Sequence, residues 1–346
     1  MDVTLTDDQE LLRETASRLA DDLATPGADA VETGAKAPWL PLVELGVPAL
    51  RSPEHSGIDA SGVEAALVVE EFGRTLSTAP VVGQALVVPE LLTAAGATEL
   101  LDRVVAGDVR LAPMLRRDCA GLGELGDDLV AFDAAGATHG LAVDRSGRER
   151  RLVAVALPDA PLDGLDLTRT LVAVDAGAAA VEIGDLGTSI APGRWAMVMA
   201  LGLTMVAADL VGIMRGALDD VVGYVAERRQ FGVPVGTFQA VQHLAADALV
   251  LLEGARSCCW YAAWAIDHRD PATALLAART AKGYTSKAGL AVVEVTVQLF
   301  GGIAITWEQM SHLRLRRTLF DRQIWGDETV QYDEVARLRL ANPELV

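Results

Sequence analysis

Cysteine is scarce in this sequence and follows no recognisable pattern. Cys119, Cys258 and Cys259 are the three cysteines among 346 residues, and their spacing fits neither a zinc site nor a disulfide framework. Cys258 and Cys259 are neighbours in a segment that is expected to be helical, where adjacent side chains point to different faces. A reduced, cytoplasmic protein is therefore the simplest expectation.

Positive charge is also in short supply. The chain has 29 Lys and Arg residues against 48 Asp and Glu residues, which gives a formal net charge of −19. This excess of negative charge argues against nucleic acid as a partner, and it offers no general attraction for an anionic ligand. A phosphate-binding site would therefore have to be built locally, from a few arginines.

Long apolar runs are missing as well. The longest run, residues 195–208, ends at Asp209 and is shorter than a bilayer requires, so we expect a helix buried inside a bundle. Residues 1–3 lead into an acidic segment without the basic, apolar and small-residue order of a signal peptide. No membrane association is expected, and the length allows two or three globular domains.

The chain begins with segments of helical periodicity, and short strand-like segments follow them. Capping-box patterns at Thr6 with Gln9, and at Ser61 with Glu64, precede two apolar helices, the second of which is expected to end at Gly73. From about residue 108 to 187, short apolar runs alternate with Gly, Asp and Pro, which predicts a small antiparallel sheet. These runs are 129–132, 152–157, 171–174 and 179–183.

From about residue 192 the chain is helical again. Long helices joined by short loops predict an antiparallel bundle. The helices are expected near 195–227, 237–268, 271–299 and 307–324, with a shorter one near 328–340. The predicted fold is therefore mainly α with a small central β-domain: an N-terminal α-helical domain at 1–107, a middle β-domain at 108–190 and a C-terminal four-helix bundle domain at 191–346.

The corner between the first two bundle helices has a distinctive composition. A helix runs into Arg228, a glycine-containing turn with Phe231 follows, and Thr237 is placed to cap the next helix. A guanidinium offers forked, permanently charged donors to phosphate oxygens, and Phe231 offers an apolar wall. The corner suits a phosphorylated, planar ligand, although a solvated charge pair at an ordinary turn explains the same residues.

Two later segments also allow both a structural and a functional interpretation. Gly301 and Gly302, which follow Gln298 at the end of the third bundle helix, are an ordinary helix stop or a place where a ligand approaches bare backbone. Asp327 and Glu328 lie in the last loop, where Asp327 is placed to cap the final helix. A carboxylate that acts as a base there would need burial to raise its pKa.

Other patterns are weaker. Gly121, Gly123 and Gly126 spell GxGxxG, but a strand rather than a helix is expected after them, which argues against a dinucleotide fingerprint. The five histidines are scattered and no HExxH pattern occurs, so no metal site is expected.

Taken together, the order and the sequences of these motifs resemble those of the acyl-CoA dehydrogenase family. Members of this family are flavoenzymes built from a helical domain, a β-domain and a four-helix bundle. The most specific matches are RRQFG at 228–232 with FQAVQ at 238–242, and QLFGGI at 298–303 with TWE at 306–308. LTDDQ at 5–9 and EEFGR at 70–74 are also similar to that family. The resemblance covers the whole chain.

The resemblance implies FAD as the cofactor. In such enzymes the arginine matching Arg228 binds the FAD pyrophosphate across a subunit interface, and the positions matching Gln230 and Phe231 flank it. The positions matching Gln298, Gly301 and Gly302 contact the adenylate half of FAD from the same subunit. FAD would then bridge two chains, which implies a homo-oligomer or a hetero-oligomer.

The resemblance also implies a reaction, the removal of two hydrogens from the α and β carbons of an acyl-CoA thioester. A carboxylate takes the α-proton while the flavin takes the β-hydride, and the electrons pass to an electron-transfer protein. The family's base follows a tyrosine in the last loop, but the equivalent place here is about Trp325 and Gly326. An alternative base on the first bundle helix is also absent, since residues 196–208 contain no carboxylate.

Asp327 and Glu328 are the nearest carboxylates to this place, and Glu328 reaches further. A second departure lies in the β-domain, where LAPMLRRD at 111–118 replaces the family's Thr-Glu-Pro and Gly-Ser-Asp segments that hold the flavin ring. Two functions are therefore open. The chain is a self-sufficient FAD-dependent acyl-CoA dehydrogenase that uses Glu328, or it is the non-catalytic subunit of an α2β2 dehydrogenase that lends Arg228 and Gln298 to FAD held by a paralogous chain.

Overall fold

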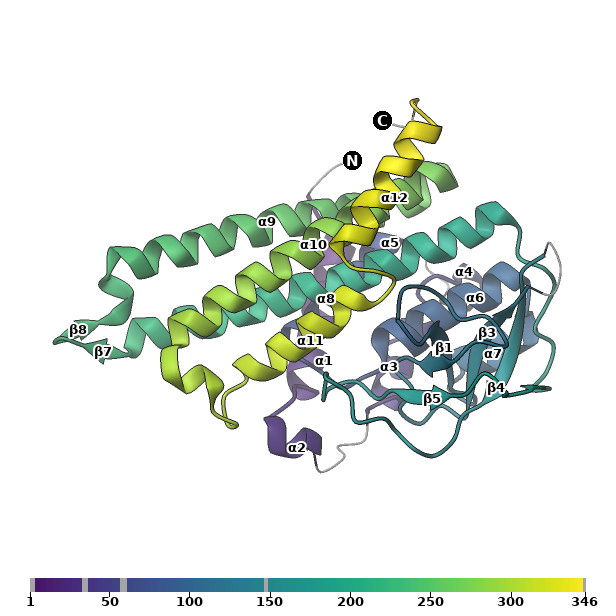
Figure 1. The fold of residues 1–346 in the computed structure, drawn as a ribbon, viewed down its shortest axis with the longest axis horizontal. Helices are drawn as coiled ribbons and strands as arrows, with labels where there is room; N and C mark the ends of the chain where they lie inside the picture. Colours follow the sequence, from purple (N-terminus) through teal and green to yellow (C-terminus); the bar gives the residue numbers. More distant parts are fainter. Residues whose placement is uncertain (1–3, 33–36, 57–60, 146–148, 345–346) are drawn as a thin grey trace.

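The chain is mainly helical, with one six-stranded sheet and one two-stranded hairpin (Figure 1). The computed structural model describes residues 4–32, 37–56, 61–145 and 149–344, so residues 1–3, on which the expectation about a signal peptide rests, lie outside the described part. The long helices of the C-terminal half run along the molecule. The six-stranded sheet lies beside one end of them, and the hairpin protrudes at the other (Figure 1).

The N-terminal helices begin where the sequence predicts. Both predicted capping boxes are formed, at α1 (Asp7–Asp22) and at α5 (Gly62–Arg74). α5 is buried along almost its whole length and packs on α8. The other N-terminal elements are α2 (Ala28–Glu32), α3 (Leu40–Glu44), η1 (Val47–Ala49), α4 (Pro53–Ser56), the π-helical turn η2 (Val81–Val87), α6 (Val88–Ala95) and α7 (Thr98–Val105).

Gly73 does not end α5, contrary to the sequence prediction. The helix continues to Arg74, and Gly73 faces α8 instead. A Cβ at Gly73 would lie 2.6 Å from the carbonyl oxygen of Asp209. The glycine is therefore required for close packing of two helices rather than for a helix stop.

The sheet has the strand order β5-β2-β1-β3-β4-β6. Its neighbours pair antiparallel except for β1 and β3, which are parallel, so the prediction of an antiparallel sheet is wrong for the central pair. The four predicted runs each contain a strand, whereas β1 and β3 were not among them. The strands are β1 (Leu111–Arg116), β2 (Leu129–Ala131), β3 (His139–Asp144), β4 (Arg151–Ala156), β5 (Val172–Val174) and β6 (Ala180–Val181).

The helices of the C-terminal half confirm the sequence prediction to within a few residues. α8 (Pro192–Glu227), α9 (Gln239–His268) and α10 (Pro271–Phe300) pack on one another, and α11 (Ser311–Gln323) and α12 (Glu328–Ala341) pack on α10. Thr237 does not cap α9, because the helix begins two residues later and the hydroxyl of Thr237 donates to the carbonyl oxygen of Pro234.

Two helices are long and apolar enough to span a membrane, by length and composition alone: Pro192–Glu227 and Pro271–Ile305. In the most apolar part of the first, 89% of the residues are buried inside the protein, which is typical of a core helix and agrees with the expectation for residues 195–208. In the second the share is 39%, and the exposed residues of α10 are polar: Thr280, Lys287, Glu294 and Gln298.

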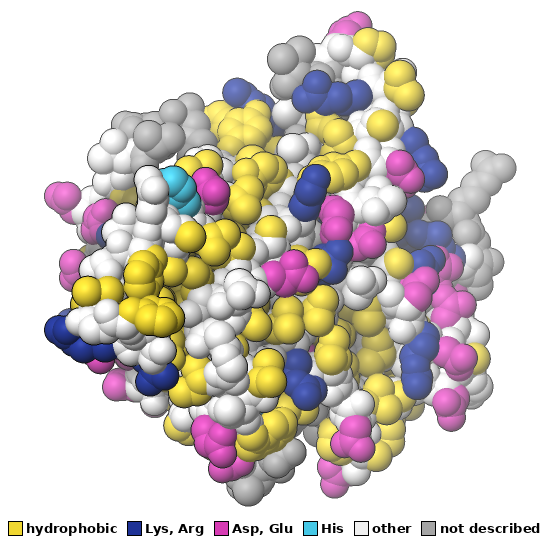
Figure 2. Space-filling model, turned by 60° about the vertical axis from the view of Figure 1, so that its left-hand side comes forward, with side chains coloured by type: hydrophobic (Ala, Val, Ile, Leu, Met, Phe, Trp, Pro, Cys, Tyr) yellow, Lys and Arg dark blue, Asp and Glu magenta, His cyan; other side chains and the backbone are white. Residues whose placement is uncertain are grey.

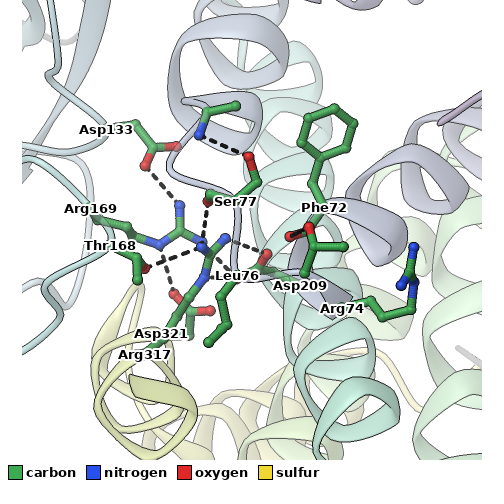
Figure 3. Close-up of polar contacts among 12 residues, drawn as sticks. Phe72, Arg74, Leu76, Ser77, Asp133, Thr168, Arg169, Asp209, Arg317 and Asp321 are labelled. Carbon is green, nitrogen blue, oxygen red and sulfur yellow. Dashed lines mark hydrogen bonds and ion pairs between the residues drawn. The ribbon is translucent and has the colours of Figure 1, made fainter. Parts of the chain in front are cut away.

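A buried network of charges joins the N-terminal helices, the sheet and the bundle (Figure 3). Arg317 of α11 donates two hydrogen bonds to Asp209 of α8, at 2.7 and 2.8 Å, and one to the carbonyl oxygen of Ser77, at 2.8 Å. Arg169, from the loop before β5, donates to Asp209 and to Asp133, each at 2.7 Å. All five residues are buried, so two guanidinium groups connect three parts of the chain.

Asp321 adds a further carboxyl group to this network. Burial raises the pKa of Asp321 well above its usual range, and the neighbouring Asp209 carboxylate adds to the rise. Burial also acts on Asp209, but Arg317 and Arg169 outweigh it and lower the pKa of that carboxyl group. Burial therefore favours the neutral form of Asp321, whereas the two arginines favour the ionised form of Asp209.

Replacing Arg317 by methionine should lower the free energy of unfolding by about 3–5 kcal/mol, because Asp209 would lose one of its two buried cationic partners. Urea denaturation at neutral pH measures the change. Arg337→Met is the control, since Arg337 pairs with Glu334 on an exposed face of α12 and should contribute little. Equal effects of the two substitutions would contradict the assigned role of the network.

Candidate functional site

The corner between α8 and α9 forms a tight hairpin. β7 (Arg229–Gln230) pairs with β8 (Val233–Pro234), and the two linking residues, Phe231 and Gly232, have φ angles of +53° and +84°. Two consecutive positive φ angles are typical of a type I′ turn, and the first is unfavourable for phenylalanine. Phe231 is nonetheless 93% exposed, with its ring edge-on to Phe238. An exposed aromatic on a strained turn indicates a surface that a partner covers.

The end of α10 lies beside this hairpin. The rings of Tyr224, near the end of α8, and Phe300, the last residue of α10, are 5.0 Å apart. Gln298 is exposed, and Gly301 has φ +68° and ψ −146°, a combination that favours glycine. A Cβ at Gly301 or Gly302 would meet nothing within 4 Å, so the backbone here is open to approach. The six residues predicted to contact FAD are thus brought to one end of the bundle.

These residues fit the phosphate and adenylate parts of FAD. Within the described ranges of the chain, the guanidinium of Arg228 and the side-chain amide of Gln298 have no hydrogen-bond or ion-pair partner. An unpaired arginine in a chain of net charge −19 leaves its forked donors available for a pyrophosphate. The open glycine backbone allows a flat group to approach closely.

Apolar side chains are exposed around the same end. Figure 2 turns it forward and shows hydrophobic side chains spread over the surface among arginines and carboxylates. Exposed apolar area of this kind marks a protein–protein contact. The large apolar residues exposed on the hairpin, the adjoining helix ends and the first half of α9 are Val222, Phe231, Val233, Phe238, Leu244, Leu249, Val250, Ile303 and Ile305.

The loop between α11 and α12, residues 324–327, lies against the sheet, and we call it the Trp325 loop. The backbone N–H of Trp325 donates to the carbonyl oxygen of Cys119, at 2.6 Å, in the turn that follows β1. Trp325 is 3% exposed, and its ring lies over Gly202 of α8, where a Cβ would come within 2.5 Å of it. The turn after the segment that replaces the family's flavin-ring holder is thus bonded directly to the loop at the place of the family's base.

Neither predicted catalytic carboxylate is free. Asp327 accepts hydrogen bonds from the N–H groups of Thr329 and Val330, at 3.0 and 3.1 Å, and so caps α12 as predicted. Glu328 accepts two hydrogen bonds from Arg322, at 2.5 and 3.2 Å. Burial alone would raise the pKa of Glu328, but the contacts with Arg322 hold it below its usual value. A base for a weakly acidic carbon requires the opposite shift.

Gly326 is fixed in a conformation that disfavours a side chain. Its φ is +93°, and a Cβ would lie 2.6 Å from Val330. Gln331 donates to the carbonyl oxygen of Trp325 at 2.5 Å, and Lys282 donates to that of Gly326 at 3.1 Å. Neither residue was expected from the sequence, where Lys282 is one of two lysines, with Lys287, in the largely apolar α10.

The larger cavities lie away from this loop. A cavity of 590 Å³ lies between α1, α5, α8 and α9, where Glu70 pairs with Arg215 and Arg256. Another, of 560 Å³, adjoins Asp166 and Arg169 in the loop before β5. The residues that line these two cavities do not include Trp325, Asp327 or Glu328.

The remaining sequence patterns are structural. Gly121, Gly123 and Gly126 are followed by β2 instead of a helix, so the dinucleotide fingerprint is not formed. Gly123 packs on β1, where a Cβ would lie 3.1 Å from the backbone of Leu115. Among the residues that the structure describes, no group of three or more His, Cys, Asp or Glu side chains is arranged to hold a metal ion.

Gly202→Ala should destabilise the chain by about 1–3 kcal/mol, because the added methyl group would overlap the Trp325 ring. Gly223→Ala is a matched control on the same helix, since a Cβ there meets nothing, and it should be neutral or stabilising. Thermal and urea unfolding measure both, and the cost at Gly202 should shrink in a Trp325→Ala background. A cost that stays the same would show that the ring does not lie over Gly202.

Comparison with known proteins identifies the family. Residues 6–108 match the model of the acyl-CoA dehydrogenase N-terminal domain, and residues 195–339 match that of the C-terminal domain. Acyl-CoA dehydrogenase IpdE2 from Mycolicibacterium smegmatis is 31% identical over 333 residues, which cover 93% of this chain and 96% of the relative.

Solved structures agree with this assignment. The structure described as the Tcur3481-Tcur3483 steroid ACAD G363A variant is 26% identical, with a TM-score of 0.81 over 98% of this chain and 99% of that one. Butyryl-CoA dehydrogenase from Megasphaera elsdenii shares the fold, at 21% identity and a TM-score of 0.82 over 98% of this chain and 100% of that one. The predicted fold class is thereby confirmed. The chain belongs to the acyl-CoA dehydrogenase family, whose members are FAD-dependent flavoproteins, as the sequence predicted.

Proposed function

We propose that this chain is the FAD-sharing, non-catalytic subunit of a heteromeric acyl-CoA dehydrogenase. One observation carries the proposal: within the described residues the side chain of Arg228 has no polar partner, whereas the Trp325 loop is closed and both predicted catalytic carboxylates, Asp327 and Glu328, are engaged. A paralogous chain would supply the base and most of the flavin-ring pocket.

The cofactor contribution of this chain would be electrostatic and steric. Arg228 holds the pyrophosphate, while Gln298 and the backbone at Gly301 and Gly302 receive the adenylate half. Gln230 and Phe231 flank the phosphates, and the exposed apolar surface around the hairpin is covered by the partner. When bound, FAD supplies hydride acceptance from the β-carbon of an acyl-CoA thioester.

The chain's own half-site would be inactive for two reasons. The ring of Trp325 occupies the space over Gly202, and the first turn after β1 is bonded to the same loop, so the sheet and the bundle are joined directly at this place. The contacts with Arg322 also hold the pKa of Glu328 below its usual value, so its carboxylate is a weaker base.

We also propose that the substrate is an acyl-CoA with a bulky, ring-containing acyl group, and that an electron-transfer protein accepts the electrons. The similar structure described as a steroid ACAD, whose description names two proteins, supports both the paired assembly and the bulky substrate.

The first experiment is the visible absorption spectrum of the chain purified alone and co-purified with a paralogous dehydrogenase chain. We expect no flavin spectrum alone, and a spectrum from the complex that an acyl-CoA bleaches under anaerobic conditions. A chain that binds FAD alone and is bleached would overturn the proposal in favour of a self-sufficient dehydrogenase.

Arg228→Ala should weaken FAD retention by the complex by about 10–100-fold, the value of lost charge-assisted hydrogen bonds. The fold should persist, because this guanidinium forms no hydrogen bond or ion pair among the described residues. Arg229→Ala is the matched control. Arg229 is the adjacent residue, and its guanidinium donates to the carbonyl oxygen of Gly232 at 3.5 Å. Retention of flavin by Arg228→Ala, measured by absorbance after gel filtration, would refute the interface assignment.

Glu328→Gln should leave turnover of the complex unchanged, because the ion pair with Arg322 gives Glu328 a structural role. Steady-state kinetics with an artificial electron acceptor measures kcat. Complete loss of turnover in a complex that keeps its flavin would identify Glu328 as the base and contradict the non-catalytic assignment.

A further inference from the structure

The cavity of 590 Å³ between α1, α5, α8 and α9 has two buried carboxylates in its wall, which the proposed function does not use. They belong to Glu70 and Glu71 of the EEFGR segment and are 5% and 2% exposed. Burying paired charges contributes little to stability, because the cost of removing them from water offsets the attraction between them. Two such carboxylates beside a cavity therefore indicate a role other than stability.

Each of these carboxylates holds an arginine that lines the same cavity. Arg215 of α8 donates two hydrogen bonds to Glu71, both at 2.8 Å, and lies 3.5 Å from Glu70. The Nε of Arg256, on α9, donates to Glu70 at 3.1 Å. Burial alone would raise the pKa of Glu71, but Arg215 and Arg74 outweigh it and lower that pKa. Glu71 is therefore a permanent anion that fixes the orientation of its arginine.

The two arginines keep further donors for a ligand. A guanidinium has five N–H groups, and each Nη atom of Arg215 carries a second hydrogen besides the one that it gives to Glu71. The side chains of Arg215 and Arg256 are 25% and 20% exposed, against 3% for Glu71 and 7% for Glu70. The arginines are thus more accessible from the cavity than the carboxylates that hold them.

Arg13 of α1 adds a third guanidinium to the lining of the cavity. Arg13 pairs with Glu10 and Arg256 pairs with Glu253, in each case three residues away on the same helix. The side chains of Glu10 and Glu253 are 43% and 54% exposed. Exposed pairs of this kind contribute little, so the carboxylate of a ligand can replace them at small cost.

The rest of the lining includes a large aromatic surface. Trp260 and Tyr261, which are adjacent on α9, line the cavity together with Leu67 of α5. Aromatic side chains favour contact with other flat rings. The volume of the cavity lies within the range of roughly 300–1,000 Å³ that is typical of small-molecule sites. The cavity therefore combines cationic donors with a surface for rings.

We propose that this cavity binds a small aromatic carboxylate. The carboxylate group accepts hydrogen bonds from Arg13, Arg215 and Arg256, and the rings lie against Trp260 and Tyr261. Forked guanidinium donors match the two oxygens of a carboxylate. The cavity lies between four helices, which favours a small molecule over a segment of another protein.

A single negative charge suits this site better than two. Glu70, Glu71 and Glu253 also line the cavity, and they would repel a dianion more strongly than a monoanion. The inference goes beyond the proposed function and does not depend on it, because the residues that line the cavity do not include Arg228 or Gln298.

2-Naphthoate is the probe, and isothermal titration calorimetry on the full chain measures its binding. We expect saturable binding of one molecule per chain. 2-Naphthamide, which has the same rings without the charge, should bind at least about tenfold more weakly, because it cannot form charge-assisted hydrogen bonds with the arginines. Absence of saturable binding of 2-naphthoate up to about 1 mM would overturn the proposal.

Substitutions locate the bound probe. Arg256→Met should weaken 2-naphthoate binding by about 10–100-fold, the value of lost hydrogen bonds to a charged group. Arg13→Met, whose only itemised pair is exposed, should keep the fold and weaken binding by about 2–5-fold. Arg18→Met is the matched control on α1, since Arg18 is not among the residues that line the cavity, and it should leave binding unchanged.

The exposed apolar surface of the hairpin is the competing place for an aromatic probe, and Phe231→Ser tests it. Binding that survives Arg13→Met and Arg256→Met unchanged, or that is lost in Phe231→Ser, would contradict the proposed site. The test uses neither FAD nor a partner chain, so its failure would leave the FAD-sharing proposal standing. Conversely, a chain that binds FAD alone would defeat the proposed function and leave the binding of 2-naphthoate unaffected.

Discussion

Two buried guanidinium groups, those of Arg169 and Arg317, determine how the parts of this chain meet. Buried charges must be paired, so the carboxylate of Asp209 on α8 cannot separate from either arginine without a large cost. Arg169 also ties the sheet to this point through Asp133, and Arg317 ties the N-terminal helices to it through Ser77. The sheet, α8 and α11 are therefore fixed together, and the loop after α11 has to lie against the turn after β1.

This constraint produces a molecule with two unlike ends. At the hairpin end, the backbone is open at Gly301, an arginine is unpaired and apolar side chains are exposed. At the sheet end, hydrogen bonds from Trp325, Gln331 and Lys282 satisfy the last loop from three sides. Under the proposed function, the first end is completed by another chain, whereas the second is complete in itself. The proposed division of labour between two chains agrees with such an arrangement.

The features that depend on local sequence patterns were predictable, whereas the features that were missed depend on contacts between distant parts of the chain. The long bundle helices, the capping boxes and the cap at Asp327 depend on local patterns, so they were predicted correctly. β1 and β3 were missed because Pro113 and Gly140 interrupt their patterns and because their parallel pairing joins distant segments. The meeting of Arg228, Gln298 and Gly301 at one end of the bundle could be predicted from short motifs, whereas the pairing of Glu328 with Arg322 and the contacts of Lys282 with the last loop depend on tertiary structure.

The left-handed backbone of the Trp325 loop also limits how this chain can change in evolution. Trp325 and Gly326 have φ angles of +58° and +93°, and the side chain of Val330 fills the space beside Gly326. A glutamate at this place would require the turn, the tryptophan and Val330 to change together, and each step alone would be destabilising. A carboxylate lost by side-chain exchange can return by one mutation, but one excluded by backbone geometry cannot. Under the proposed function, a chain with this loop is held to dependence on a partner by its own conformation.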